Sequence, residues 1–133
     1  MTHVSRRKLD SQTEKILTSA LKELFTYLKP REIDKVFSAL VTNTENIMIA
    51  KRLAIIIMLF GNISYSEISR SLNLTNQTIS RVHSEMYDRP EIYKFINKKL
   101  SPWKRKELLK AVVKELGLQG VKLFAKHSGG RIY

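Results

Sequence analysis

Eight consecutive apolar residues, Leu53 to Phe60, constrain the fold of this 133-residue chain more than any other feature. The run ends at Gly61 and continues a helical pattern that begins near Glu45, so it would be apolar on every side of a helix. Such a helix needs cover from other parts of a protein. The run is far shorter than the ~20 residues that cross a bilayer, and the N-terminus has no apolar signal core. We therefore expect a soluble, cytoplasmic protein without membrane contact, with this helix at the centre of the fold or across a subunit boundary.

The remaining apolar residues also recur at helical spacing, which predicts an all-α fold. Ser11 followed by Glu14 is typical of a capping box, and Ser101 followed by Pro102 is typical of an N-cap and a first helical residue. The pattern shows no strand alternation, repeat or low-complexity segment. Outside residues 64–82, the expected helices cover residues 11–28, 31–41, 45–60, 90–100 and 102–116. We expect Pro30 to stop the first of these helices and Gly61 to take a left-handed cap position after the third. We also expect a short turn or helix near Val121 to Phe124 and a frayed tail from His127.

The stretch SYSEISRSLNLTNQTISRV, residues 64–82, contains two short helical patterns joined without glycine or proline. Ser64 and Glu67 form a second capping box, and Thr75 can cap the helix that follows. Asn73 stands where the chain must reverse, and asparagine tolerates positive φ. This spacing predicts a helix-turn-helix. The positions expected to be buried or closely packed within it are Ile68, Ser69, Leu72, Leu74, Ile79 and Val82.

Polar side chains dominate the outward side of the second helix. Glutamine or asparagine can bond adenine at two points, arginine can bond guanine, and serine or threonine can serve several bases. The helix N-terminus favours phosphate. The candidate DNA-contacting residues are Tyr65, Thr75, Asn76, Gln77, Thr78, Ser80, Arg81 and Ser84. The alternatives are a solvated polar face and, for Arg81, an ion pair with Glu85 one turn later.

The formal net charge of +12 is concentrated towards the C-terminus. Residues 1–88 hold 12 Lys and Arg against 9 Asp and Glu, whereas residues 89–133 hold 12 against 3. A helical segment this positive favours binding to a polyanion, most often nucleic acid, although a solvated lysine-rich surface has the same composition.

The sequence contains no motif that is typical of a metal site or of an enzyme active site. It has no cysteine, and the three histidines are scattered, so we expect no metal site. We see no nucleophile elbow, phosphate-binding glycine loop or carboxylate pair, so we expect no catalytic residues and no enzyme activity. Two interpretations stay open: a sequence-specific double-stranded DNA-binding transcriptional regulator, or a module that binds protein or RNA and uses the helix-turn-helix as scaffold.

The stretch LVTNTENIMIAKRLAIIIMLFGNISYSEISRSLNLTNQTISRVHSEM, followed by RPEIYKFINKKL, resembles the Trp repressor family over residues 11–100. The resemblance implies an intertwined homodimer whose two reading helices enter successive major grooves, and it adds Ser66 and Ser69 to the candidate DNA contacts. Residues 1–100 would then form the dimerisation and DNA-binding domain, and residues 101–133 a basic helical extension. Such a repressor would be associated with the nucleoid.

The same resemblance implies an effector pocket at Lys51, Arg52, Arg81 and Glu85. A lysine has no flat guanidinium to stack on an indole, and Glu85 stands where the family has a serine, so we expect no cofactor, with tryptophan as corepressor left as an alternative. Outside this pocket, His83 is expected at the surface. Trp103 is expected to pack, with stacking on nucleic acid as its alternative.

Overall fold

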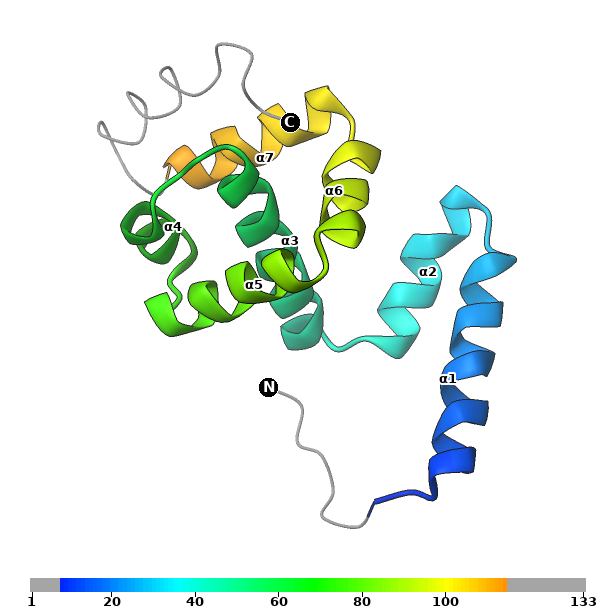
Figure 1. The fold of residues 1–133 in the computed structure, drawn as a ribbon. Coiled ribbons are helices and arrows are strands. Elements are labelled where there is room, and N and C mark those ends of the chain that lie inside the picture. Colours follow the sequence, from blue (N-terminus) through cyan, green and yellow to red (C-terminus); the bar gives the residue numbers. More distant parts are fainter. Residues whose placement is uncertain (1–7, 115–133) are drawn as a thin grey trace. The chain divides into compact units, whose positions relative to one another are not determined.

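The computed structural model describes residues 8–114, which form seven α-helices and no strand (Figure 1). The all-α prediction is confirmed for this range, and none of its helices is long and apolar enough to pass through a membrane. The expected end of the helix over residues 102–116, the short turn or helix near Val121 to Phe124 and the tail from His127 lie outside the described residues. The helices are α1 (Ser11–Thr26), α2 (Pro30–Leu40), α3 (Asn43–Phe60), α4 (Tyr65–Leu72), α5 (Asn76–Asp88), α6 (Pro90–Lys99) and α7 (Pro102–Lys114).

The chain divides into two compact units, Met1–Ile49 and Ala50–Tyr133. In the first unit, the predicted cap of α1 is wrong by one residue. Asp10 is the N-cap, its carbonyl accepts from Glu14 N at 2.9 Å, and Ser11 is already helical. Pro30 also differs from its expected role, since α1 ends at Thr26 and Pro30 is the first residue of α2. Proline suits that position because its missing N–H would have no helical partner.

Apolar contact within the first unit is thin. Phe25 of α1 and Phe37 of α2 meet edge to face with ring centroids 5.6 Å apart. Among its described residues, 8–49, no side chain is buried. Ile16 and Leu17 on α1 are 63% and 54% exposed. This unit therefore leaves most of its apolar surface in water.

Helix α3 begins two residues before the expected Glu45. Thr42 caps it through a reciprocal pair of bonds, in which Glu45 N donates to Thr42 Oγ1 at 3.1 Å and Thr42 N donates to Glu45 Oε1 at 2.9 Å. Its C-terminal half lies in the second unit, where Ala54 through Met58 are all buried. The apolar half of this helix therefore lies in the core of the second unit, as one of the two expected positions, and a position across a subunit boundary stays a prediction.

The end of α3 differs from the prediction for Gly61. The residue with positive φ is Asn62, at 60°, and Gly61 does not have this conformation. Ile63 N donates to Met58 O at 3.0 Å and so closes the helix end. An asparagine takes the left-handed position because its short polar side chain tolerates it better than other non-glycine residues.

The core of the second unit joins the end of α3 to α4, α5 and α7. Ile68 of α4 and Ile79 of α5 are fully buried, and Leu109 of α7 is 2% exposed in the same cluster. Figure 1 shows α4 and α5 meeting at their short turn, and α7 lies against α4. The predicted division between residues 1–100 and 101–133 stays a prediction, although α7 belongs to the same compact unit as α4 to α6.

Candidate nucleic-acid interface

The turn between α4 and α5 is built on one left-handed residue. Asn73 has φ 54° and ψ 55°, as its place in the sequence predicted. Leu74 N donates to Ser69 O at 3.1 Å, and the Ser69 hydroxyl donates back to Leu74 O at 2.5 Å. Ser69 is thus half-buried and closes the turn, and its predicted DNA contact stays a prediction.

Two hydroxyl caps start the helices of the motif, as predicted. The Ser64 side chain accepts from Glu67 N at 3.3 Å, and the Thr75 side chain accepts from Thr78 N at 3.2 Å. The hydroxyls of Thr75 and Thr78 also lie 3.0 Å apart and bond to each other. Both caps act over three residues, so the sequence alone locates the start of α4 and α5.

Residues 76–84 of α5 have an inner apolar side and an outer polar side. Ile79 and Val82 are 0% and 6% exposed and hold the helix against the core. The outer polar residues are exposed, and their side chains make no hydrogen bond or ion pair with any other described residue. These residues are Asn76, Gln77, Ser80, Arg81 and Ser84, and Ser66 on α4 shares both properties.

Tyr65 and His83 form a contact that the sequence analysis missed. The Tyr65 hydroxyl and His83 Nδ1 are 2.7 Å apart, which ties α4 to α5, and the His83 ring stacks on Tyr87 with centroids 4.9 Å apart. His83 is half-buried and lies against Tyr65, so it is less accessible than its predicted surface position implied. The two partners are 18 residues apart, and no local spacing signals such a pair.

Glu85 has a hydrogen-bond partner on the next helix. Its Oε2 accepts from the Tyr93 hydroxyl of α6 at 2.9 Å, whereas Arg81 forms no ion pair within residues 8–114. Partial burial of Tyr93, reinforced by the bond to Glu85, raises the pKa of its hydroxyl above the ordinary 10.0. The ion pair with Glu85, which was one of the alternatives for Arg81, is therefore absent from residues 8–114. The guanidinium of Arg81 is available to a ligand or to DNA.

The four predicted effector residues are absent from the lining of the cavity beside α5. Lys51 is half-buried, and Arg52, Arg81 and Glu85 are exposed. A cavity of about 250 Å³ does lie beside α5, but its lining is Leu59, Phe60, His83, Met86, Tyr87, Pro90, Tyr93 and Lys94, without any of these four. The effector assignment stays a prediction.

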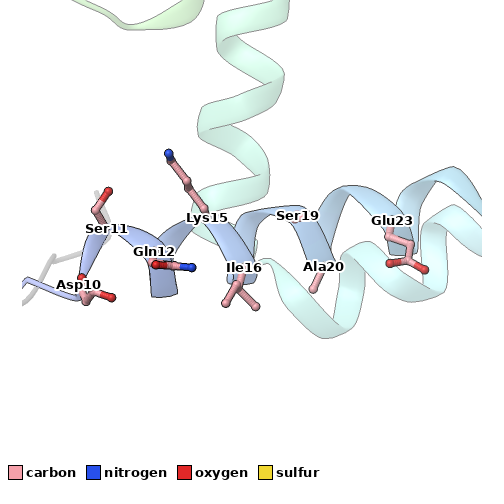
Figure 2. Close-up of a pocket in the computed structure, with 8 residues that line it drawn as sticks. All are labelled: Asp10, Ser11, Gln12, Lys15, Ile16, Ser19, Ala20 and Glu23. Atoms are coloured by element: carbon pink, nitrogen blue, oxygen red, sulfur yellow. The ribbon is translucent and has the colours of Figure 1, made fainter.

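A hollow beside α1 also lacks the features of a site. Figure 2 shows that the eight lining residues all come from α1 and its N-cap. All eight are exposed, so the hollow is one face of a helix in contact with solvent. Within residues 8–114, no three histidine, aspartate or glutamate side chains gather in a way that could hold a metal ion.

Helices α6 and α7 carry a basic surface with one exception. Arg105 is 7% exposed, and its Nη1 donates to Asn97 O and Leu100 O at the end of α6. It therefore supports the fold instead of facing a polyanion. The exposed lysines on these helices are Lys94, Lys98, Lys99, Lys104, Lys106, Lys110 and Lys114.

Trp103 stands at the start of this surface. Its side chain is 68% exposed, so the expectation that it packs within the chain is wrong for the described structure. Lys104 Nζ lies 5.2 Å from the Trp103 ring centroid and also pairs with Glu107 at 2.8 Å. An exposed ring with a lysine at its face is compatible with stacking or with a protein contact.

The chain matches a known protein family. The family model described as Trp repressor protein covers residues 14–101, which include α2 to α6 completely and most of α1. This match confirms the resemblance found in the sequence. Comparison with curated proteins and with solved structures gave no match.

Proposed function

The chain belongs to the Trp repressor family, and on that premise we propose that it is a homodimeric, sequence-specific regulator of transcription that reads the DNA major groove with α5. Membership of a helix-turn-helix regulator family suggests DNA binding and gives no support to an enzyme. The finer points, which are specific sites, dimerisation and control, are argued below from the described residues.

The outer side of α5 carries the proposal. Asn76 and Gln77 at its N-terminus are exposed and have no side-chain partner among the described residues, while Ile79 beneath them is fully buried. Because Ile79 is buried, it fixes the orientation of α5, and the side-chain amides of Asn76 and Gln77 point to solvent in a defined direction. DNA would not have to break an existing hydrogen bond with another described residue in order to bind these amides. That arrangement suits direct readout of base edges, which needs donors and acceptors at defined positions in the groove.

Each group has a distinct role in this proposal. Gln77 or Asn76 bonds adenine at N6 and N7, and Arg81, which has no ion pair with any of residues 8–114, bonds guanine or phosphate. Ser66 and Ser84 are short, exposed hydroxyls suited to phosphate or sugar. The N–H groups at the start of α5, next to Thr75, favour a phosphate in the same place.

Selection from a random duplex library tests sequence-specific binding. We expect one enriched, near-palindromic motif with half-sites about 34 Å apart. Gln77→Ala should weaken binding to that motif by about 1–3 kcal/mol and relax the preference at one base position. The matched control is Gln12→Ala, an exposed glutamine of α1, which should bind like the wild type.

The basic surface gives a second readout. Replacing Lys104 and Lys106 with glutamine should weaken binding to all duplexes alike and reduce the salt slope by about 1 for each lost phosphate contact. Arg105 is left unchanged in this variant because it is buried. A library that yields no motif, together with equal losses on random DNA from Gln77→Ala and the lysine variant, would favour a module that binds protein or RNA.

The exposed apolar surface of the first unit supports dimerisation. The described part of the first unit has no buried residue, and the apolar side of α1 includes Leu21 and Leu24, which are 48% and 42% exposed. An apolar surface of this kind is costly in water and marks a protein contact. A second copy of the chain is the partner that the family resemblance implies, and a two-fold dimer would also match a near-palindromic site.

Sedimentation tests the dimer directly. The wild type should sediment at about twice the chain mass of 15.4 kDa. Leu17→Glu combined with Leu21→Glu should give the monomer, because it places two charges on the apolar side of α1. Lys22→Glu, which changes an exposed charge on the same helix, should stay dimeric. A monomeric wild type at micromolar concentration would refute the dimer.

Two further points belong to the same proposal. The protein acts in the cytoplasm, associated with the nucleoid through its DNA, and needs no cofactor. Tryptophan control is tested by repeating the duplex selection with and without the amino acid: an unchanged motif and affinity support regulation without tryptophan, and a clear gain in affinity supports a corepressor that contacts Arg81.

A further inference from the structure

An open groove lies in the unit Ala50–Tyr133, where the end of α3 meets α6 and α7. We name it the α6–α7 groove. A closed cavity of about 150 Å³ holds a benzene-sized molecule, and this groove, at about 550 Å³, has room for two large apolar side chains. None of the residues assigned to DNA or to the predicted effector lines it. The lining residues are Phe60, Lys94, Asn97, Lys98, Pro102 and Arg105.

The surface of the groove is almost wholly apolar, although two buried polar residues line it. Arg105 is 7% exposed, and its Nη1 donates to the carbonyls of Asn97 and Leu100. Arg105 Nε and Asn97 Oδ1 are shut off from solvent, so neither atom faces the groove. An occupant therefore contacts carbon surface from Phe60 and Pro102 and from the methylene stems of the lysines.

This lining fits part of a larger molecule better than a free small molecule. Sites for small organic ligands carry a few polar groups that fix the ligand, and almost none is accessible inside this groove. Apolar side chains also continue beyond the lining. Phe95 follows Lys94 in α6 and is 60% exposed, and Trp103 follows Pro102 at the start of α7 and is 68% exposed. Extended apolar surface of this kind marks contact with a macromolecule.

The charge at the groove indicates the chemistry of that macromolecule. Lys94 and Lys98 are exposed and lie one helical turn apart on α6, and no acidic residue lines the groove. Residues 89–114 contain nine basic and two acidic residues. Two acidic side chains one turn apart on an opposing helix have the same spacing as these two lysines, about 5–6 Å between Cβ atoms. The groove is therefore complementary in charge to an acidic helix.

One wall of the groove lies beyond the family match. The family model ends at residue 101, whereas Pro102 and Arg105 belong to α7. The bonds from Arg105 to the carbonyls of Asn97 and Leu100 hold the start of α7 against the end of α6. The groove is thus a fixed feature that α7 adds to the residues shared with the family.

We propose that the α6–α7 groove docks an acidic amphipathic helix of a partner protein. Two large apolar side chains one turn apart on that helix lie against Phe60 and Pro102, in the manner of a helix in an apolar groove. Flanking aspartate or glutamate side chains pair with Lys94 and Lys98. A nucleic-acid backbone has phosphates for the lysines but no apolar side chain for the groove, so the apolar lining favours a protein.

Emission from Trp103, the single tryptophan of the chain, reports docking without a label. The probe is a synthetic peptide of about 15 residues, long enough to form a helix, without tryptophan. It has glutamate on its polar face and leucine and phenylalanine one turn apart on the other. Matched probes replace the two apolar residues with alanine, or the glutamates with lysine. We expect a saturable blue shift with the first peptide, and binding at least about tenfold weaker with each of the others.

Two matched double variants locate the contact. Lys94→Gln with Lys98→Gln removes both ammonium groups at the groove and should weaken the acidic peptide by about three- to tenfold. Lys110→Gln with Lys114→Gln makes the same change in net charge outside the lining and should weaken it by less than about twofold. All four side chains are exposed, so both variants should fold like the wild type.

Four results would overturn the proposal. An absence of any saturable shift at millimolar acidic peptide would exclude docking, and equal losses in the two double variants would mean that only the overall charge attracts the peptide. Tighter binding of an oligothymidylate with the same net charge would assign the surface to a nucleic acid. A blue shift on raising the concentration of the protein alone would mean that a second copy covers the groove. The titrations contain no DNA, so none of these results bears on the proposed regulator.

Discussion

Replacement of Ser69 by alanine separates a hydroxyl that closes the turn from one that contacts DNA. In the structure, Ser69 Oγ donates to Leu74 O at 2.5 Å, and both residues are half-buried. The variant removes this donor and leaves a partly buried carbonyl one partner short. One such bond contributes about 0.5–1.5 kcal/mol, and an orphaned buried group costs about 1–3 kcal/mol. Since the bond from Leu74 N to Ser69 O persists, we expect a loss of about 1–1.5 kcal/mol in the free energy of unfolding.

Urea unfolding followed by circular dichroism measures that loss, and the melting temperature should fall by roughly 4–10 °C. Binding to the selected duplex is measured by fluorescence anisotropy at several salt concentrations, and the salt slope should not change. Ser66→Ala is the matched control. Ser66 is exposed on the same helix without a side-chain partner among the described residues, so its replacement should change the free energy of unfolding by less than about 0.5 kcal/mol.

The reverse pattern would refute the reasoning. If Ser69→Ala unfolds like the wild type but binds all duplexes more weakly, with a salt slope reduced by about 1, the hydroxyl contacts phosphate and the turn does not depend on it. A loss of stability in Ser66→Ala equal to that in Ser69→Ala would also contradict the role assigned to the bond with Leu74.

Three other replacements test neighbouring features. Asn73 has φ 54°, so Asn73→Ala should lower the free energy of unfolding by about 1 kcal/mol. Asn73→Gly should change it by less than about 0.5 kcal/mol, and urea unfolding measures both variants. An Asn73→Ala variant more stable than the wild type would contradict the left-handed turn. Tyr65→Phe removes the hydrogen bond to His83 Nδ1 and should lower the free energy of unfolding by about 1 kcal/mol in the same assay. Tyr87→Phe keeps the ring that stacks on His83 and should lower it by less. Equal losses in the two variants would exclude a specific contribution from the Tyr65 hydroxyl. Tyr93 has a raised pKa when folded, so its contribution to stability is complete below about pH 10, the unfolded value, and declines as the pH rises towards the folded value. The melting temperature of the wild type should therefore exceed that of Tyr93→Phe by a constant amount up to about pH 9, and by less above pH 10; a difference independent of pH up to pH 11 would refute this.

Much of the fold follows from interactions between residues close in the chain. Ser64 and Thr75 cap helices through N–H groups three residues away, and Asn73 reverses the chain by its own backbone conformation. The eight-residue apolar run predicted a central helix because no exposed helix can carry apolar residues on every side. The same local rules were less accurate where two neighbours compete for one role, as with Asp10 against Ser11 and Asn62 against Gly61.

The sequence by itself therefore determined the helices, the turn and the set of polar side chains at the start of α5, since each depends on spacings of a few residues. Only the tertiary structure decided which groups pair across helices. Tyr65 bonds His83, Glu85 bonds Tyr93 instead of Arg81, and Arg105 is buried at the end of α6 instead of exposed to a polyanion. The physical reason is that such contacts depend on the angle and distance between packed helices, which no pattern along one helix encodes.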